Sequence, residues 1–478
     1  MIALDSFSFV NLGPPPSTGS DGDFDTLFSL GSLTDTYLEK VAPRGGRGID
    51  RIGTDSFELQ RATQLQIASS KATAGSYHFA PYLEKLILRG AHRPPRRLAV
   101  PTLRDRAVLQ QLKLFLQGPF AGSIERRLPN EFIRKVKSFA AAADVSSLGV
   151  IRTDISSFYD EIRHDQLLAI IASRITSKRA CDLVRRAVRN PTLPAHTSRD
   201  ARRGAGNRCG VPQGLPVSNL LAAAYLEEFD AELKSVSELY LRYVDDILVV
   251  APLDSLEALN SLMATRLKDL GLRLNAEKTY SGPLSNRFDY LGYSFELPGA
   301  SVRKASVERF LRGIAARFSA YQHRSLQGGH PKWLSPDQRR QAFIEELNEK
   351  ITGAISGTHR YGWLFYYSEI DDLALLHKLD AVIGRMFRRL PDFRGTSLTS
   401  LKRLSRAYFE VKYSPTGGYV HDYNALSTSA EQLAFLVRRG AVDQANVSSM
   451  SVEEIGRLFQ RERDRRLAGL DRDIGFLY

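Results

Sequence analysis

Apolar residues recur along the chain with two different spacings, and these spacings predict helices and strands in an interspersed order. A helical spacing predicts helices over residues 26–45, 105–116, 163–190, 217–234 and 254–270. Short apolar runs predict strands from residue 148 and at residues 239–243, 247–250, 272–274 and 290–295. Residues 1–25 are rich in turn formers and predict a loose arm, whereas the pattern beyond about residue 300 is mostly helical.

The charge balance narrows the class of partner. The 478 residues carry a formal net charge of +13, with a pI of about 9.6. This excess favours nucleic acid as a partner, although many basic proteins bind nothing acidic. Two or three packed units are expected for this length.

The small number of cysteines and the absence of long apolar runs favour a cytoplasmic location. Cys181 and Cys209 are the only cysteines, and their spacing suggests neither a disulfide framework nor a cysteine-based zinc site. The first residues lack the pattern of a signal peptide, and no apolar run approaches the length of a membrane span. We therefore expect a cytoplasmic protein without a membrane partner.

An acidic pair interrupts the two apolar runs at residues 239–250. Asp245 and Asp246 stand between them, where adjacent carboxylates repel one another and where a tight turn usually prefers Asn or Gly. A divalent cation would remove this repulsion. Taken alone, the pair is more simply explained as a solvated acidic turn.

A third aspartate changes this interpretation. Asp154 ends another apolar run, and a shared sheet could bring it close to Asp245. Magnesium prefers hard oxygen ligands, and two such ions can activate a 3′-hydroxyl and stabilise a leaving pyrophosphate. The three carboxylates are therefore candidates for a catalytic metal site.

Several motifs, taken in order, resemble those of reverse transcriptases, the group II intron-like bacterial enzymes in particular. The Tyr-Val-Asp-Asp sequence at 243–246 is similar to the family's metal-binding signature. Five more segments resemble its other motifs in the same order along the chain, namely 97–106, 154–160, 210–218, 272–279 and 290–295. The resemblance covers residues 77–300, and its strength lies in the order of motifs that are individually weak.

The resemblance implies roles for particular residues. Asp154, Asp245 and Asp246 would be catalytic and would bind two Mg²⁺ ions, or Mn²⁺, with the carbonyl of Ile155 as an additional ligand. Tyr159 stands where the family places the gate that excludes a 2′-hydroxyl, which implies dNTP substrates; the alternative is a buried aromatic without a gating role.

Further residues would contact the incoming nucleotide. Gln213 and Gly214 are expected beside it, because glycine allows a close approach of the backbone. Arg97, Arg104 and Arg106 are candidates for binding the triphosphate, since guanidinium groups match phosphate oxygens; the alternatives are a pair with Asp105 or a place on the surface. Lys278 could protonate the pyrophosphate or could be a solvated lysine at a strand end.

The same resemblance implies an α+β fold of the right-hand polymerase type. Fingers and palm, with an antiparallel sheet plus helices, would occupy residues 46–300 after an N-terminal extension at 1–45. A helical thumb would follow at 301–410 and a helical C-terminal extension at 411–478. The Gly-Trp-x-x-Tyr-Tyr stretch at 362–367 resembles the thumb of intron-encoded enzymes, with its aromatics mostly in the core.

Departures from the family pattern bear on the subgroup. The usual Ser-Pro is Ser218-Asn219 here, and the tail shows neither a His-Cys nuclease motif nor an RNase H pattern. What remains is most similar to stand-alone, defence-associated reverse transcriptases of the unknown-group or abortive-infection type. The implied partners are an RNA template, a DNA or RNA primer and dNTPs; a dedicated structured RNA and a homo-oligomer stay open.

Two alternatives to the RNA-directed DNA polymerase follow from the same motifs. One is a maturase-like RNA-binding protein that retains the fold without catalysis, although a pure binder has no need for three carboxylates. The other is template-independent or protein-primed DNA synthesis by the same active site. The sequence does not distinguish the template, the primer or the trigger.

Overall fold

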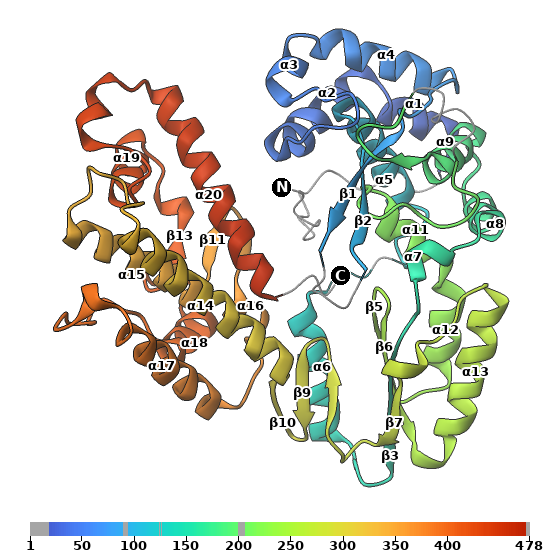
Figure 1. Cartoon of the computed structure of the whole chain (residues 1–478). Coiled ribbons are helices and arrows are strands. Elements are labelled where there is room, and N and C mark those ends of the chain that lie inside the picture. The colour runs from blue at the N-terminus through green and yellow to red at the C-terminus, as the bar shows by residue number, and fades with distance from the viewer. Residues whose placement is uncertain (1–18, 89–93, 124, 126, 199–205, 475–478) are drawn as a thin grey trace. The chain divides into compact units, whose positions relative to one another are not determined.

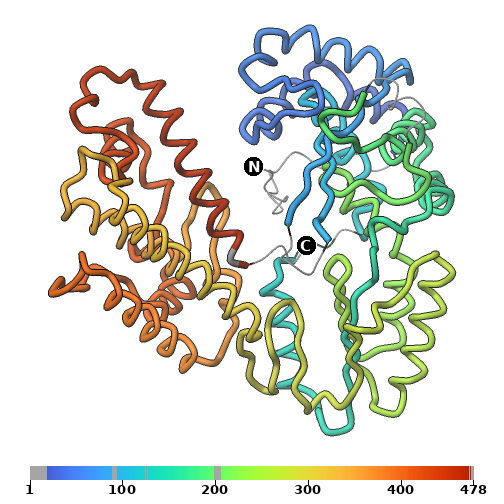
Figure 2. The backbone as a smooth tube through the Cα atoms, viewed as in Figure 1, coloured from blue at the N-terminus to red at the C-terminus, as the bar shows by residue number. Residues whose placement is uncertain are grey.

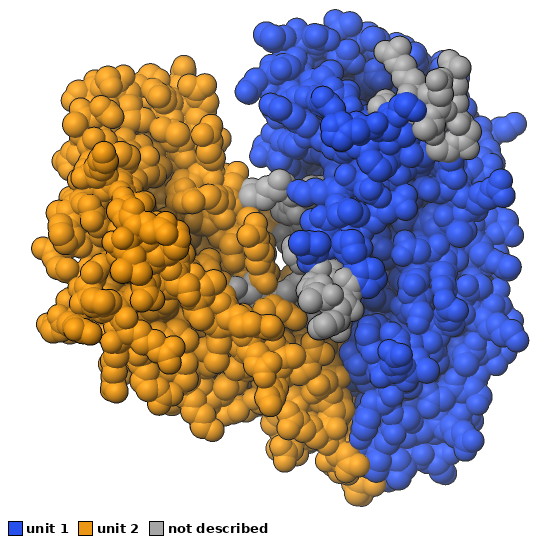
Figure 3. All heavy atoms as spheres, viewed as in Figure 1, with its two compact units in different colours: residues 1–126, 147–283 blue, residues 127–146, 284–478 orange. Residues whose placement is uncertain are grey.

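The computed structural model describes residues 19–88, 94–123, 125, 127–198 and 206–474. The chain forms two compact units (Figure 3): unit 1 comprises residues 1–126 and 147–283, and unit 2 comprises residues 127–146 and 284–478. Among the described residues, every helix is too short or too polar to cross a membrane.

Unit 1 combines a layer of helices with two sheets (Figure 1). Its helices are α1 (Asp21–Leu27), α2 (Leu30–Thr36), α3 (Thr54–Glu58), α4 (Arg61–Thr73), α5 (Leu103–Gln117), α7 (Phe158–Glu161), α8 (His164–Arg174), α9 (Lys178–Arg189), α11 (Ser218–Tyr225), α12 (Glu227–Ser235) and α13 (Leu256–Asp269). Its strands are β1 (Tyr82–Ile87), β2 (Arg96–Val100), β3 (Leu148–Asp154), β4 (Thr192–Leu193), β5 (Leu239–Tyr243), β6 (Asp246–Pro252) and β7 (Tyr280–Pro283).

The larger sheet of unit 1 has the strand order β5-β6-β3-β7, and all of its neighbouring strands are antiparallel. The central strands β3 and β6 are buried along nearly their whole lengths, which explains their apolar sequences. Helix α13 packs closely on β3, because a Cβ atom at Gly149 would lie only 2.5 Å from Leu256. This close packing holds α13 against the sheet that carries the acidic turn.

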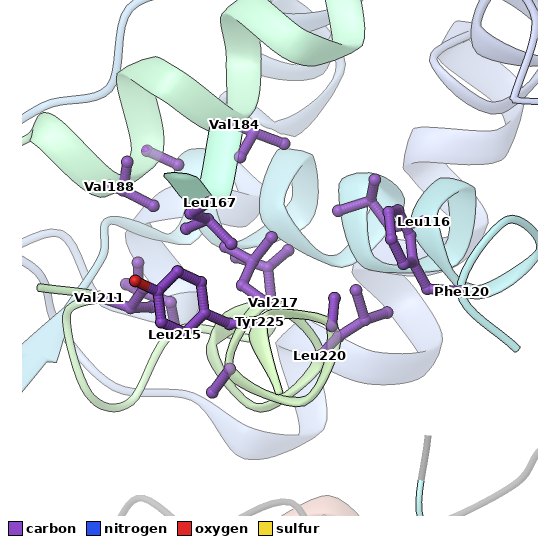
Figure 4. Close-up of a cluster of buried hydrophobic side chains, with 14 of the residues drawn as sticks. Leu116, Phe120, Leu167, Val184, Val188, Val211, Leu215, Val217, Leu220 and Tyr225 are labelled. Atoms are coloured by element: carbon purple, nitrogen blue, oxygen red, sulfur yellow. The ribbon is translucent and has the colours of Figure 1, made fainter. Parts of the chain in front are cut away.

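A single hydrophobic core joins the helices of unit 1 (Figure 4). Leu116 of α5, Leu167 of α8, Val184 of α9 and Leu220 of α11 contribute to one cluster of buried side chains. Val211, Leu215 and Val217 from the connection before α11 reach into the same cluster. The segment at 210–218 is therefore anchored by its apolar side chains on the helices.

The N-terminal helices differ from the sequence prediction at one point. The single helix expected at 26–45 is replaced by α1, α2 and a π-helical turn at Tyr37–Val41. The break occurs where the Ser29 side chain accepts a hydrogen bond from the Ser32 amide and so starts a new helix. Phe24 and Phe28 stack with ring centroids 4.1 Å apart in the core of unit 1. The domain boundary expected at residue 45 stays a prediction.

Unit 2 is mainly helical. Its helices are α6 (Pro129–Ala142), α14 (Lys304–Leu326), α15 (Pro336–Thr352), α16 (Trp363–Tyr366), α17 (Leu373–Phe387), α18 (Leu404–Tyr413), α19 (Ser429–Arg438) and α20 (Val452–Ile474). Two small sheets accompany them, built from β8 (Phe288–Tyr290), β9 (Tyr293–Glu296), β10 (Gly299–Val302), β11 (Ala354–Ser356), β12 (His359–Tyr361) and β13 (His421–Asp422).

Helix α6 belongs to unit 2 although residues of unit 1 surround it in the sequence. Residues 127–146 are drawn in cyan in Figure 2, and in the sequence they lie between the two stretches of unit 1. Arg134 and Lys137 of α6 form ion pairs of 2.7 Å with Glu369 and Asp371, respectively. Phe132, Ile133 and Val136 lie buried on the same helix, so charge and apolar packing both hold α6 in unit 2.

The aromatic residues of the 362–367 stretch form a core, as expected from the sequence. Trp363 stacks on Phe310 of α14 with ring centroids 4.8 Å apart, and Tyr367 lies 4.9 Å from Trp363. Arg385, Arg388 and Arg389 are exposed at the end of α17. The α+β fold class, with an antiparallel sheet followed by a helical C-terminal region, is confirmed.

Two predicted strands take a different form. Residues 272–274 make only an isolated bridge between Leu274 and Ile155, because β3 ends at Asp154 and offers no further pairing. The strand expected at 290–295 is divided into β8 and β9 by a tight turn. Leu291 and Gly292 have φ values of 48° and 80° there, which interrupts an extended chain.

Candidate active site

The sheet of unit 1 brings the three aspartates to one place on the backbone. In the antiparallel pairing of β3 with β6, Asp154 lies directly opposite Asp246. The β5–β6 turn carries Asp245, whose carbonyl accepts a hydrogen bond of 3.1 Å from the amide of Ile155. Residues distant in the sequence therefore meet because their strands pair.

Each of two aspartate side chains contacts a basic residue. Asp154 forms an ion pair with Lys278, and Asp246 lies 3.3 Å from Nη2 of Arg152. Arg152 also donates Nη1 to the carbonyl of Lys278 at 3.1 Å, which links the two pairs. In the described part of the chain, no group of three or more His, Cys, Asp or Glu side chains is arranged to hold a metal ion.

The electrostatics of the site still suit a cation. Burial, followed by the charges of Asp246 and Asp154, raises the pKa of Asp245 to about 7. Asp154 is 7% exposed, and its Oδ1 is buried without a hydrogen-bond partner among the described residues. Crowded carboxylates and an unsatisfied carboxylate oxygen are features that a divalent cation would stabilise.

The acidic turn is strained. Only two residues, Val244 and Asp245, separate the paired residues Tyr243 and Asp246. Val244 has a φ of 58°, a left-handed value that a β-branched residue rarely adopts and that glycine usually supplies in hairpin turns. Such a conformation costs on the order of 1–3 kcal/mol and persists only where surrounding contacts fix it.

A buried ion pair provides those contacts. Arg242 donates Nη1 to the carbonyl of Val244 at 2.8 Å and Nε to Oδ1 of Asp230 at 2.6 Å. Asp230 also accepts a hydrogen bond of 2.7 Å from the hydroxyl of Tyr240. The guanidinium therefore connects helix α12 to the strained turn and stabilises the conformation of Val244.

Tyr159 lies close to the carboxylates. Burial, followed by the charge of Asp245, raises the pKa of its phenol. Its hydroxyl donates a hydrogen bond of 2.8 Å to Oδ1 of Asn219. Its carbonyl accepts a hydrogen bond of 2.7 Å from the amide of Val211. Both contacts connect Tyr159 to the segment at 210–219.

Gln213 and Gly214 pack against β2. The carbonyl of Gln213 accepts a hydrogen bond of 2.7 Å from the amide of Ala99. Gly214 has a φ of 101°, and a Cβ atom there would lie 3.1 Å from the Ala99 carbonyl oxygen. Glycine is therefore required at this position for the close approach of two backbones.

The three candidate arginines have different surroundings. Arg97 is 57% exposed, forms an ion pair of 2.8 Å with Glu84 and donates to the Thr192 carbonyl. Arg104 donates to Gln64 at 3.2 Å, on the side of helix α4. Arg106 donates to the carbonyl of Gly45, and burial lowers its pKa. The structure thus distributes these side chains and does not gather them at the aspartates.

Sequence reasoning missed four residues of this site. The positive charge of Arg96 opposes the rise in the pKa of Asp245 and Asp160. Asn219 accepts the hydrogen bond of the Tyr159 hydroxyl. Arg152 and Arg242 contact the aspartates or the turn from within the strands. The available signal was the position of these two arginines inside otherwise apolar strands, where an unpaired charge is costly.

The central segment is similar to a known protein family. Residues 95–295 match the model described as reverse transcriptase (RNA-dependent DNA polymerase). The matched segment contains β2, the segment at 210–219 and the three aspartates.

Similar proteins include a bacterial and a fungal one. Protein YkfC of Escherichia coli is 25% identical over 292 residues, which cover 52% of this chain and 74% of that protein. An uncharacterised 91 kDa protein in the cob intron of Schizosaccharomyces pombe is 35% identical over 80 residues, 17% of this chain and 9% of that protein.

A solved structure of apo telomerase from Candida tropicalis, truncated from its C-terminal domain, has a TM-score of 0.37 and 13% identity. That likeness covers 53% of this chain and 61% of the telomerase chain.

Proposed function

We propose that the chain is an RNA-directed DNA polymerase that joins dNTPs to a primer on an RNA template. The support is that residues 95–295 match the reverse transcriptase model. The observation that carries the catalytic assignment is the pairing of Asp154 with Asp246 beside the strained Asp245 turn. Three carboxylates at one end of a sheet are costly for folding, and their cost is explained by a cation-dependent reaction.

We assign the metal site to Asp154, Asp245, Asp246 and the carbonyl of Ile155. When bound, two Mg²⁺ ions, or Mn²⁺, would activate the primer hydroxyl and stabilise the leaving pyrophosphate. Lys278 and Arg152 would neutralise the carboxylates in the absence of metal, as their contacts with Asp154 and Asp246 indicate. Once Asp154 is engaged by metal, Lys278 would be released from this ion pair and could serve as the proton donor to pyrophosphate.

The reaction is tested by dNTP incorporation on an RNA template with a DNA primer. Incorporation is expected with Mg²⁺, loss with EDTA, and recovery when Mg²⁺ is restored, because the carboxylates supply oxygen ligands. Primer extension on a sequencing gel is the measurement. Tight RNA binding without incorporation on any template would favour the maturase-like alternative. A DNA product covalently attached to the protein would instead indicate protein priming.

We assign the exclusion of rNTPs to Tyr159, with Asn219 as the residue that positions its ring. The support is the 2.8 Å hydrogen bond between the Tyr159 hydroxyl and Asn219 Oδ1. Gln213 and Gly214, whose segment contacts both Tyr159 and Ala99, would form the neighbouring wall of the nucleotide site. Arg97, Arg104 and Arg106 remain the candidates for the triphosphate, with Arg96 added because its charge reaches Asp245.

Tyr159→Ala is expected to reduce the preference for dNTP over rNTP by about 10- to 100-fold, because the ring no longer blocks the 2′-hydroxyl. Tyr159→Phe and Asn219→Ala both remove the hydrogen bond and keep a ring, so each should change this preference by only about 2- to 10-fold. Single-nucleotide incorporation kinetics give the ratio of kcat/KM values. An unchanged preference in Tyr159→Ala would contradict the gating role.

We further propose a role in antiphage defence, as a stand-alone bacterial enzyme using a dedicated structured RNA. The support is the resemblance of the ordered motifs to those of bacterial reverse transcriptases. The proposal is tested by phage plating on cells that carry either the wild-type chain or a catalytically inactive variant.

A further inference from the structure

A basic cavity lies within unit 2, outside the segment at 95–295. It has a volume of about 370 Å³ and lies among helices α14, α15 and α20 and the turn after α19. Eight of its lining residues are Arg or Lys, and three are Glu. The basic residues are Arg317, Arg324, Arg339, Lys350, Arg439, Arg465, Arg466 and Arg472, and the acidic residues are Glu346, Glu349 and Glu462. The cavity wall therefore carries a large excess of positive charge.

The three carboxylates are already engaged by part of this set. Oε2 of Glu349 lies 3.2 Å from Nη2 of Arg439 and 3.4 Å from Nη1 of Arg466. Oε1 of Glu462 accepts hydrogen bonds of 2.7 Å from both Arg465 and Arg466. These contacts leave little carboxylate capacity for Arg324, Arg339 and Arg472.

Glu346 is engaged as well, since its Oε1 lies 3.3 Å from Nε of Arg317. Arg324, Arg339 and Arg472 form no ion pair with any carboxylate of the cavity among the described residues. A phosphate group is the type of ligand that matches several converging guanidinium groups.

A buried donor at this cavity supports the presence of a ligand independently of the charge count. The side chain of Arg439 is only 3% exposed. Its Nη1 is buried and finds no hydrogen-bond partner within the described part of the chain. Nε and Nη2 of Arg439 face Glu345 and Glu349, whereas Nη1 calls for an acceptor that the described residues do not supply, because buried donors are normally satisfied.

Lys350 adds a second buried cation to the wall. It is 2% exposed, and burial, followed by the charge of Arg317, lowers its pKa to about 7. The surroundings thus oppose positive charge in the free protein. A bound anion would reverse this effect and would stabilise the protonated amine.

We propose that the cavity binds a compact anion with several phosphate groups, recognised through its polyphosphate chain. Its volume lies within the range of small-ligand sites and is too small for a nucleic-acid duplex. A ligand held by α14, α15 and α20 would connect three helices of unit 2 by charge. This site is independent of the polymerase assignment, because none of its residues belongs to the segment at 95–295.

The test uses the full chain, EDTA and inorganic tripolyphosphate as the probe, with binding measured by isothermal titration calorimetry. The double variant Arg339→Ala/Arg472→Ala removes two partly or fully exposed cations of the wall, so it should fold normally. We expect it to weaken binding about tenfold or more, because each arginine can make a charge-assisted hydrogen bond.

Arg340→Ala is the matched control. Arg340 neighbours Arg339 on α15 but pairs with Asp337 and does not line the cavity. Its replacement should leave the affinity within about twofold of wild type, since only general surface charge changes. A second readout is the thermal shift produced by tripolyphosphate, which the double variant should lose and the control should keep.

Parallel titrations with ATP separate the two sources of the same chemistry. Equal affinities for ATP and tripolyphosphate would identify the phosphate chain alone as the ligand, whereas tighter binding of ATP would identify a nucleotide. The proposal is overturned if tripolyphosphate does not bind, or if Arg340→Ala weakens it as much as the double variant. It is also overturned if only RNA binds and tripolyphosphate fails to compete.

Discussion

Asp245→Asn is expected to lower the rate of dNTP incorporation by about 10³-fold or more, because metal ions supply several kcal/mol of transition-state stabilisation. The substitution preserves the shape of the side chain and removes its charge. Asp245 is the carboxylate whose pKa is raised to about 7 by burial and by Asp246 and Asp154. Loss of the charge should therefore affect catalysis without disturbing the turn.

The same substitution should leave the fold intact or stabilise it. A raised pKa means that folding favours the neutral carboxyl, so the charged form costs stability as the pH rises above the unfolded value near 4. At pH 8 the uncharged amide is expected to raise the free energy of unfolding by about 1 kcal/mol, measured by thermal or denaturant unfolding. An inactive variant that is also less stable would point to a structural role for Asp245.

Asp254→Asn is the control for this experiment. Asp254 is exposed in the short turn before α13 and lies outside the acidic site. The Asp254→Asn variant should incorporate dNTPs at the wild-type rate and should be as stable as the wild type. If Asp245→Asn incorporates dNTPs at the wild-type rate, the catalytic assignment is refuted. The same variant in a phage plating assay tests whether catalysis underlies defence.

Arg242→Met is expected to lower the free energy of unfolding by about 3–5 kcal/mol, because it leaves the carboxylate of Asp230 buried without its partner. The side chains of Arg242 and Asp230 are only 9% and 12% exposed. Incorporation should fall on the order of 10²-fold as well, since small displacements of catalytic groups are costly. The structural reason is the lost hydrogen bond to the carbonyl of Val244.

A surface ion pair provides the comparison. Arg266 pairs with Glu232 at 2.7 Å, with side chains 49% and 30% exposed. Arg266→Met should cost only about 0–1 kcal/mol, because water screens such pairs. Chemical denaturation and primer extension give both quantities for both variants.

The double variant Arg242→Met/Asp230→Leu separates stability from positioning. Replacing both charges should restore much of the lost stability, because buried ion pairs can be replaced by apolar groups. It should not restore incorporation, since the support of the Val244 carbonyl is still absent. Full activity in the double variant, or a loss below about 1 kcal/mol in Arg242→Met, would contradict the role assigned to Arg242.

The sequence alone predicted the main elements and a candidate site with its chemistry. The apolar runs at 239–243 and 247–250 correspond to β5 and to most of β6, because a buried strand reads as a short continuous apolar run. Asp154, Asp245 and Asp246 could be singled out because like charges at the ends of apolar strands are unfavourable without a function. These features are local, so they can be recognised without knowledge of the fold.

Only the tertiary structure decided which distant residues meet. The register of β3 with β6 sets Asp154 opposite Asp246, and the path of the chain assigns α6 to unit 2. The hydrogen bond from Tyr159 to Asn219 depends likewise on contacts between segments far apart in the sequence. Pairings of this kind depend on strand register and on packing of the whole core, which no local pattern of residues encodes.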